Sequence, residues 1–240
     1  MANFTYMKHA IALLEKIDQE QGEQMKLAAE WVADNIREDR MIHVFGTGHS
    51  HMIGIEMFVR AGGLANVNAM LDPDVLTSNG ARRSGALEKL PGLADILYDQ
   101  YDIRSGDIMI IISNSGRNAM PIEMAMRAQK EGLKVIALTN LKQSEQITSR
   151  HPSGKRLFEC ADLVIDSCVP FGDAMMEVGG VPTAPGSTIS GVATINVIVN
   201  EAMMALAAEG HSLPVFASQN VDGFNNDALY EKYVGRVKHI

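Results

Sequence analysis

The chain has 240 residues, of which 46% are hydrophobic and 21% charged, and this composition fits one large α/β domain with a sizeable core. Its formal net charge is −8 and it has no basic block, which argues against nucleic acid as a partner. We expect a cytoplasmic protein with no membrane partner and no disulfide framework, because no apolar run approaches about 20 residues, no secretion signal begins the chain, and Cys160 and Cys168 form no CxxC pair.

A long helical segment is predicted at the start of the chain. Residues 4–37 lack proline, contain only Gly22 as glycine, and repeat apolar residues at helical spacing. The pattern indicates one long amphipathic helix or two shorter ones. A helix of that length cannot bury its whole apolar stripe on a small sheet, so we expect part of it to pack on a partner subunit.

The first strand, predicted at residues 41–45, ends in a glycine loop. This stretch, GTGHSH at residues 46–51, is called the first loop below, and a helix is expected from about residue 52 to residue 61. Its glycines allow a tight turn and close approach of a ligand. The loop lacks the third glycine of a dinucleotide fingerprint, and no acidic residue ends a second strand about 20 residues on. A nicotinamide cofactor is therefore disfavoured, and no cofactor is expected.

Three segments separate this loop from the third strand. Residues 64–71 are predicted as the second strand, and residues 72–85 as an irregular polar stretch that could serve as a lid. Residues 87–101 have a helical pattern that Pro91 and Gly92 interrupt.

The third strand and the loop after it carry the clearest signal. Residues 108–112 are wholly apolar, which suits a central parallel strand covered on both faces. The SNSGRN stretch at residues 113–118, called the second loop below, leads into a predicted helix at residues 119–131 and a strand at residues 134–139. Its backbone amides and its hydroxyl and amide side chains would face a ligand above the helix N-terminus. That chemistry suits an anion, most simply a phosphate.

The last part of the chain is predicted from weaker patterns. After Asn140 the expected elements are short strands at about residues 157–158 and 163–166, a loop at 171–185, a long helix at 187–208, and a last helix at 227–237.

The alternation of strands and helices predicts a doubly wound α/β fold with a mostly parallel, five-stranded sheet. With strand order 2-1-3-4-5 the first and third strands are neighbours. The first and second loops would then meet at the crevice where ligands bind such sheets. We expect a single domain over residues 1–240, made of an N-terminal helical segment (1–38), a core (41–209) and a tail (210–240).

The two loops and their strands resemble the sugar isomerase (SIS) domain family. The resemblance is carried by VFGTGHS at residues 44–50 and IISNSGRN at residues 111–118, followed by VIALTN at residues 135–140. It spans roughly residues 41–198, and the pairing of the loops makes it specific. It implies a flavodoxin-like fold that binds phosphosugars, in a family that includes phosphoheptose isomerase, an N-acetylmuramate-6-phosphate etherase and non-catalytic sugar-phosphate sensors. The tail at residues 214–223 resembles a bacterial subgroup of this family.

The resemblance also assigns the second loop. It places the phosphate on Ser113, Ser115 and Asn118, while Asn114 and Gly116 shape the loop. Asn118 replaces the usual third hydroxyl of the family, and its amide can still donate to a phosphate oxygen.

Four further positions are implied to bind the sugar phosphate. Ser50 matches a serine that contacts sugar or phosphate, and the sugar would run toward Gly48. Ser187 and Thr188 lie where the family completes its pocket. Phosphoheptose isomerases carry a histidine six residues beyond the loop serine and an acid four residues later; here Glu56 and Arg60 stand there, so neither that site nor a metal is expected.

Isomerisation through an enediol needs a group that moves a proton between adjacent carbons, and a group that stabilises the oxyanion. Three residues are candidates for moving the proton. Glu56 is either a base facing the crevice or a helix residue paired with Arg60. Glu88 is either an acid/base, by similarity to the etherases, or a stabiliser of a helix start. His49 is either a proton carrier near the ligand or a histidine bonded to loop backbone.

Three functions remain open from the sequence. The first is an aldose–ketose isomerase that acts on a phosphorylated sugar without a redox cofactor. The second is a non-catalytic sugar-phosphate sensor, and the third is a lyase or etherase acting on an N-acetylated sugar phosphate. A homodimer or homotetramer is expected, from the N-terminal helix and from what SIS proteins generally do.

Overall fold

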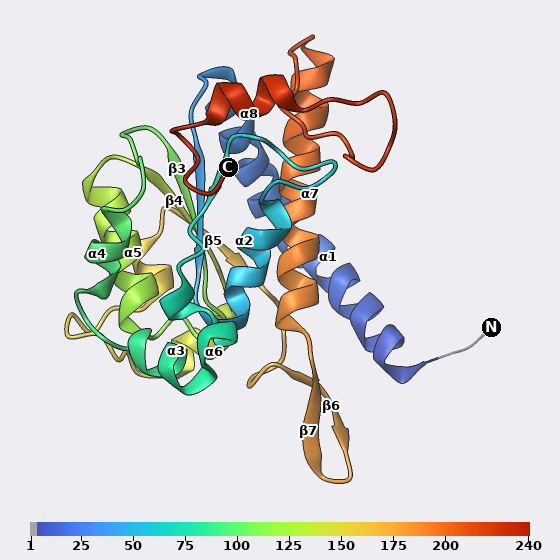
Figure 1. The fold of residues 1–240 in the computed structure, drawn as a ribbon. Coiled ribbons are helices and arrows are strands. Elements are labelled where there is room, and N and C mark those ends of the chain that lie inside the picture. Colours follow the sequence, from blue (N-terminus) through green and yellow to red (C-terminus); the bar gives the residue numbers. More distant parts are fainter. Residues whose placement is uncertain (1–3) are drawn as a thin grey trace.

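A five-stranded parallel sheet forms the centre of the computed structural model, which describes residues 4–240 (Figure 1). The strand order is β2-β1-β3-β4-β5. The strands are β1 (Ile42–Gly46), β2 (Val67–Ala69), β3 (Ile108–Ile112), β4 (Lys134–Thr139) and β5 (Leu163–Asp166). The predicted fold class is confirmed, and the strand order is the one under which the first and third strands are hydrogen-bonded neighbours.

Helices cover both faces of this sheet. One face carries α1 (Thr5–Arg37), α2 (His51–Met57) and α7 (Ser187–Ala208), and the other carries α4 (Leu93–Tyr98) and α5 (Ala119–Lys130). Strand β3 contributes side chains to the cores on both faces of the sheet, because successive side chains of a strand point to opposite faces. Ile108 and Ile110 belong to the α1/α7 core, whereas Met109 and Ile111 belong to the α4/α5 core.

The first predicted helix is one continuous element of 33 residues. Its buried positions include Ile17, Met25 and Val32, which pack with α7 and the sheet. The first three turns carry exposed apolar side chains instead. Helix α1 therefore packs on the sheet along only part of its length.

Helix α7 corrects one expectation from composition. Within residues 4–240 it is the one helix long and apolar enough to cross a bilayer by length and composition, so the statement that no apolar run approaches that length is wrong. In this structure the apolar residues of α7 belong to the protein core. The helix packs against α1 and α2, and Ile195, Ile198 and Ala202 are buried.

The segment between β2 and β3 is more regular than predicted. The second strand is shorter than residues 64–71, and the polar stretch after it holds 3-10 turns at Pro73–Val75 and Thr77–Asn79 and helix α3 (Ala81–Leu87). The helix predicted at residues 87–101 is reduced to α4, because Gly92 adopts a left-handed φ of 85° just before it.

Two predicted elements after β4 are wrong, and one helix there was not predicted. Residues 157–158 form part of a 3-10 turn (Leu157–Cys160) rather than a strand, since Leu157 and Cys160 are buried under α5. The loop predicted at residues 171–185 contains an antiparallel hairpin of β6 (Ala174–Val178) and β7 (Val181–Pro185). The polar stretch after Asn140 forms α6 (Leu141–Gln146), with the Asn140 side chain accepting a hydrogen bond from the Gln143 amide.

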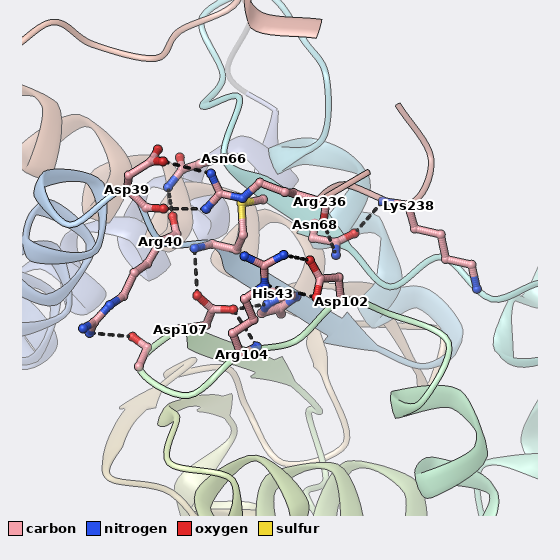
Figure 2. Close-up of polar contacts among 12 residues, drawn as sticks. Asp39, Arg40, His43, Asn66, Asn68, Asp102, Arg104, Asp107, Arg236 and Lys238 are labelled. Atoms are coloured by element: carbon pink, nitrogen blue, oxygen red, sulfur yellow. Dashed lines mark hydrogen bonds and ion pairs between the residues drawn. The ribbon is translucent and has the colours of Figure 1, made fainter. Parts of the chain in front are cut away.

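The C-terminal tail returns to the amino ends of the strands. Helix α8 (Asp227–Tyr233) ends four residues short of the predicted helix. Beyond it the Asn68 side chain donates to the Arg236 carbonyl at 3.1 Å and accepts from the Lys238 amide at 3.2 Å, and Arg236 binds Asp39 (Figure 2). The tail thus covers the side of the sheet at β2.

Candidate functional site

A pocket opens at the carboxyl ends of β1, β3, β4 and β5. Its apolar side is formed by Ile53, Ile112 and Leu138. The polar groups around it come from both loops, from the ends of β4 and β5, and from the start of α7: His49, Ser50, Asn114, Thr139, Ser167, Ser187 and Thr188. The first loop contributes His49 and Ser50 to this pocket and the second loop contributes Asn114, so the two loops meet as the strand order predicts. The other predicted binding residues of the loops do not line it: Gly48, Ser113, Ser115, Gly116 and Asn118.

The first loop is a tight turn that only glycine permits at its start. A Cβ atom on Gly46 would lie 2.7 Å from the carbonyl carbon and oxygen of Ser50. Gly48 adopts a left-handed φ of 58°, and its carbonyl oxygen lies 2.5 Å from His51 Nδ1. This turn presents the exposed His49 side chain and the partly exposed Ser50 side chain at the pocket.

The second loop is held in place by its own residues and by the end of β4. Ser113 Oγ accepts a hydrogen bond from the Gly116 amide at 3.2 Å, and the Asn140 amide donates to the Asn114 carbonyl at 3.0 Å. Gly116 has a φ of 60°, and a Cβ atom there would lie 3.0 Å from Thr139 Oγ1. These contacts within the chain fix the course of the loop.

Glu88 joins the two loops. One carboxylate oxygen accepts from Thr47 Oγ1 at 2.8 Å, and the other accepts from Asn118 Nδ2 at 2.8 Å. The Asn118 side-chain oxygen accepts in turn from Arg150 at 3.1 Å. Glu88 is thus tied to both loops, but it is not among the residues that line the pocket.

Glu56 lies in a different pocket, between α2 and α7. It forms an ion pair with Arg60 and accepts a hydrogen bond from Asn196 Nδ2 at 2.9 Å. The pairing of Glu56 with Arg60, one of the two interpretations from sequence, is present, but Arg60 lies beyond the end of α2, which stops at Met57 and not near residue 61 as predicted. Of the three candidate proton carriers, only His49 lines the pocket described above.

The start of α7 is fixed by a carboxylate. Asp173 accepts hydrogen bonds from the Ser187 amide at 2.7 Å, from the Ser187 hydroxyl at 2.6 Å and from the Gly186 amide at 3.1 Å. The Ser187 hydroxyl hydrogen is therefore already donated within the chain. Thr188 follows it at the pocket.

Several residues of the site were not predicted from sequence. Thr139 and Ser167 line the pocket at the ends of β4 and β5, where a search of strand ends could have found them. Thr47 lies inside the first loop and contacts Glu88. Arg150 and Asp173 lie in segments with no recognisable pattern, and only the fold brings them to the loops and to α7.

Sequence comparison identifies relatives along the whole chain. A family model described as SIS domain matches residues 5–140. A UPF0309 protein of Caldanaerobacter subterraneus subsp. tengcongensis is 39% identical over 242 residues, covering 98% of each chain. A UPF0309 protein of Listeria innocua serovar 6a is 39% identical over 236 residues, covering 97% of this chain and 96% of the relative.

Comparison with solved structures finds the same fold. Phosphoheptose isomerase GmhA from Neisseria gonorrhoeae superposes with a TM-score of 0.52 at 19% identity, covering 82% of this chain and 94% of that chain. The Vibrio vulnificus NanR protein complexed with ManNAc-6P superposes with a TM-score of 0.53 at 15% identity, covering 85% of this chain and 63% of that chain. At these identities the similarity is one of fold.

Proposed function

The chain belongs to the SIS domain family, and we propose that it binds a phosphorylated sugar and interconverts its aldose and ketose forms through an enediol. The observation that carries this proposal is the single pocket to which both loops contribute, with hydroxyl, amide and imidazole groups around it. The names of two structural neighbours, a phosphoheptose isomerase and a protein complexed with ManNAc-6P, support a phosphosugar as the ligand class.

The phosphate would be bound by the second loop. Its backbone amides lie before the N-terminus of α5, where partial positive charge favours an anion. Ser115 is partly exposed and can donate its hydroxyl hydrogen to a phosphate oxygen. Asn118 has one amide hydrogen engaged by Glu88, so it has less to offer the phosphate than a free hydroxyl would. The sugar would extend from there toward Ser50 and His49.

His49 is the residue we propose for proton transfer. Its imidazole would take the proton from C2 of the aldose and return it to C1, while a proton passes from the C2 hydroxyl to the C1 carbonyl oxygen. Imidazole suits this task because it can accept and release a proton near neutral pH. Glu88 would act as a positioning residue that holds the two loops together through Thr47 and Asn118.

Exchange of deuterium from solvent tests the reaction. The protein is incubated in deuterium oxide with phosphorylated aldoses and ketoses that it binds, and label at C1 or C2 is followed by NMR. We expect exchange with at least one of them, and a loss of about 100-fold or more in His49→Gln with binding retained. Tight binding without exchange for every ligand tried would sink the isomerase.

Phosphate recognition is tested separately, by calorimetry. Ser115→Ala is expected to weaken binding of the phosphosugar by about 1–3 kcal/mol, and the exposed Ser212→Ala, in the tail, serves as control. Equal binding of phosphorylated and unphosphorylated sugars would show that the second loop does not hold a phosphate.

A non-catalytic sensor is the second candidate. It is favoured because the carboxylates of the two acidic candidates for proton transfer already have partners within the chain. Glu56 is paired with Arg60, and Glu88 is bonded to Thr47 and Asn118. The exchange experiment distinguishes the two functions. The lyase or etherase expected as a third possibility would instead release a leaving group, which the same NMR spectra would show.

A further inference from the structure

Two arginines at the second loop differ from most arginines of the chain, because no carboxylate pairs with them. Of the eleven arginines, eight form an ion pair with an aspartate or a glutamate: Arg37, Arg40, Arg60, Arg83, Arg104, Arg127, Arg156 and Arg236. Within residues 4–240, Arg82, Arg117 and Arg150 form none. Arg82 is exposed on α3, whereas Arg117 belongs to the second loop and Arg150 is bonded to it. In a chain with a net charge of −8, these cations at the loop are free to attract an anion.

Arg150 is fixed to the second loop by two hydrogen bonds. Its backbone amide donates to the Arg117 carbonyl at 2.8 Å, and its Nη1 donates to Asn118 Oδ1 at 3.1 Å. Asn118 is the residue that precedes the first turn of α5. The guanidinium of Arg150 therefore lies at the N-terminus of α5. Because Arg150 is exposed and a guanidinium has several N–H groups, donors remain that solvent or a ligand can reach.

Arg117 is held by the same short segment. Its Nη2 donates to Thr148 Oγ1 at 3.1 Å, and Thr148 lies two residues before Arg150. The Nε of Arg117 is buried and has no acceptor among the described residues. Both guanidinium groups thus contact the place where the segment 148–150 lies against the second loop.

The second loop without these arginines is a poor site for a full negative charge. In the part of the chain that the structure describes, the amides of Ser115, Arg117 and Asn118 donate to no acceptor, so they are available to a phosphate. Each amide carries only a partial charge, however. The carboxylate of Glu88 accepts from Asn118 Nδ2 at 2.8 Å and places a full negative charge at the same helix start. A bound phosphate would be repelled by Glu88 unless a cation offsets this charge.

We propose that Arg150 and Arg117 supply this positive charge, and that Arg150 makes the site select a phosphorylated sugar over the same sugar without its phosphate. The two arginines lie at the loop, and Arg150 is on the opposite end of the Asn118 side chain from Glu88. A guanidinium can donate two parallel N–H groups to two phosphate oxygens, which a lysine cannot do. The inference rests on the proposed phosphosugar ligand. It does not depend on the isomerase reaction, because a sensor would use the same two arginines.

A purely structural role for Arg150 has different consequences. If Arg150 only orients Asn118, a neutral side chain that donates to Asn118 Oδ1 should serve equally well. Arg150→Gln retains an N–H donor and removes the charge, whereas Arg150→Lys retains the charge and loses the planar guanidinium. Comparison of the two variants therefore separates the charge from the hydrogen bond.

Calorimetry of the full chain with inorganic phosphate is the first test. Arg150→Gln should raise the dissociation constant of phosphate by about 10-fold, Arg150→Lys should raise it less, and Arg117→Gln should act in the same direction as Arg150→Gln. The control Arg104→Gln removes the same charge from an exposed side chain at the amino ends of the strands, and should change the dissociation constant by less than about twofold. Wild-type affinity in Arg150→Gln, or equal weakening in Arg104→Gln, would overturn the proposal.

Sugars with and without a phosphate provide the second test. Arg150→Gln should weaken binding of the phosphosugar by about 10-fold and leave the weaker binding of the unphosphorylated sugar unchanged. Equal weakening of both ligands would mean that Arg150 only maintains the shape of the loop. If the wild type binds a phosphosugar and both arginine variants bind it as tightly, this inference fails and the proposed function stands. A wild type that binds neither inorganic phosphate nor any phosphosugar would refute both.

Discussion

Asp107 is the most completely bonded carboxylate at the amino ends of the strands. It accepts from His43 Nε2 at 3.0 Å, from the Met41 amide at 3.0 Å and from the Arg104 amide at 2.9 Å (Figure 2). Burial by itself would raise the pKa of Asp107, but the hydrogen bonds from His43, Met41 and Arg104 outweigh it and hold this pKa below its usual value of 3.8. The carboxylate therefore stabilises the fold in its ionised form.

Replacing Asp107 by Asn should lower the free energy of unfolding and make it depend less on pH in the acidic range. Because the folded-state pKa is depressed, the stabilisation is present above the unfolded value near 3.8 and is lost as pH falls through the lower folded value. At pH 7 we expect Asp107→Asn to cost about 1–3 kcal/mol. Urea unfolding between about pH 5 and 2 should show a shallower loss than in the wild type.

A neighbouring carboxylate provides the control. Asp102 is bound to Arg104 at the surface, and Asp102→Asn should change the unfolding free energy by less than about 1 kcal/mol. If the wild type and Asp107→Asn lose stability in parallel as the pH falls, the bonded carboxylate is not the cause.

Glu88 gives a prediction about binding that differs from that for His49. In Glu88→Ala both carboxylate oxygens are removed, so Thr47 Oγ1 and Asn118 Nδ2 each lose their acceptor. The loops should separate, and phosphosugar binding should weaken by about 1–3 kcal/mol. Calorimetry with Glu145→Ala, at an exposed glutamate of α6, as control would check this. Unchanged affinity would mean that the loops do not need the Glu88 bridge.

At the scale of elements, α7 approaches α2 closely at a glycine. A Cβ atom on Gly191 would lie 2.9 Å from Cγ1 of Ile53, and Ile53 lines the pocket. Gly22 on α1 has no atom within 4 Å of its Cβ position among the described residues. Replacement of glycine by alanine can therefore be compared at a crowded position of α7, Gly191, and at an open position of α1, Gly22.

Gly22→Ala should stabilise the protein by up to about 1 kcal/mol, through helix propensity alone. Gly191→Ala receives the same gain but must push Ile53 aside, and crowding a packed core costs roughly 1–3 kcal/mol. We expect it to be less stable than the wild type in urea unfolding. Equal gains at both glycines would show that the helices can separate freely.

How much the sequence could predict varied by element. Strands β3 and β4 and helix α7 have the predicted bounds, because their apolar runs are bounded by clear polar residues or turns. The hairpin was missed because β7 contains two prolines and the turn two glycines, which favour a loop, and because Val178 and Val181 at its tip are exposed. The two loops were found from local pattern. The contact of Arg150 with Asn118 and that of Asp173 with Ser187 depend on the fold, so no local pattern marks them.

For the whole molecule, the sheet separates the candidate site from the tail. The pocket lies at the carboxyl ends of the strands. At the amino ends Tyr233 and Val237 of the tail are buried with Met41, Ala65 and Phe216 in a core cluster of their own. Substitutions at the pocket should therefore change ligand binding without changing stability, and substitutions in the tail cluster should change stability without changing ligand binding.

Tyr233→Ala tests this separation. Tyr233 is 2% exposed, and removing a large buried side chain costs about 3–5 kcal/mol. Phe224→Ala, in the same tail but 63% exposed, should stay within about 0.5 kcal/mol of the wild type. Under conditions where the variant remains folded, Tyr233→Ala should bind phosphosugar as the wild type does, whereas Ser115→Ala should keep its stability and bind less well. A Tyr233→Ala variant that is folded but binds poorly would mean that the tail acts on the pocket through the sheet, because no residue from the tail lines that pocket.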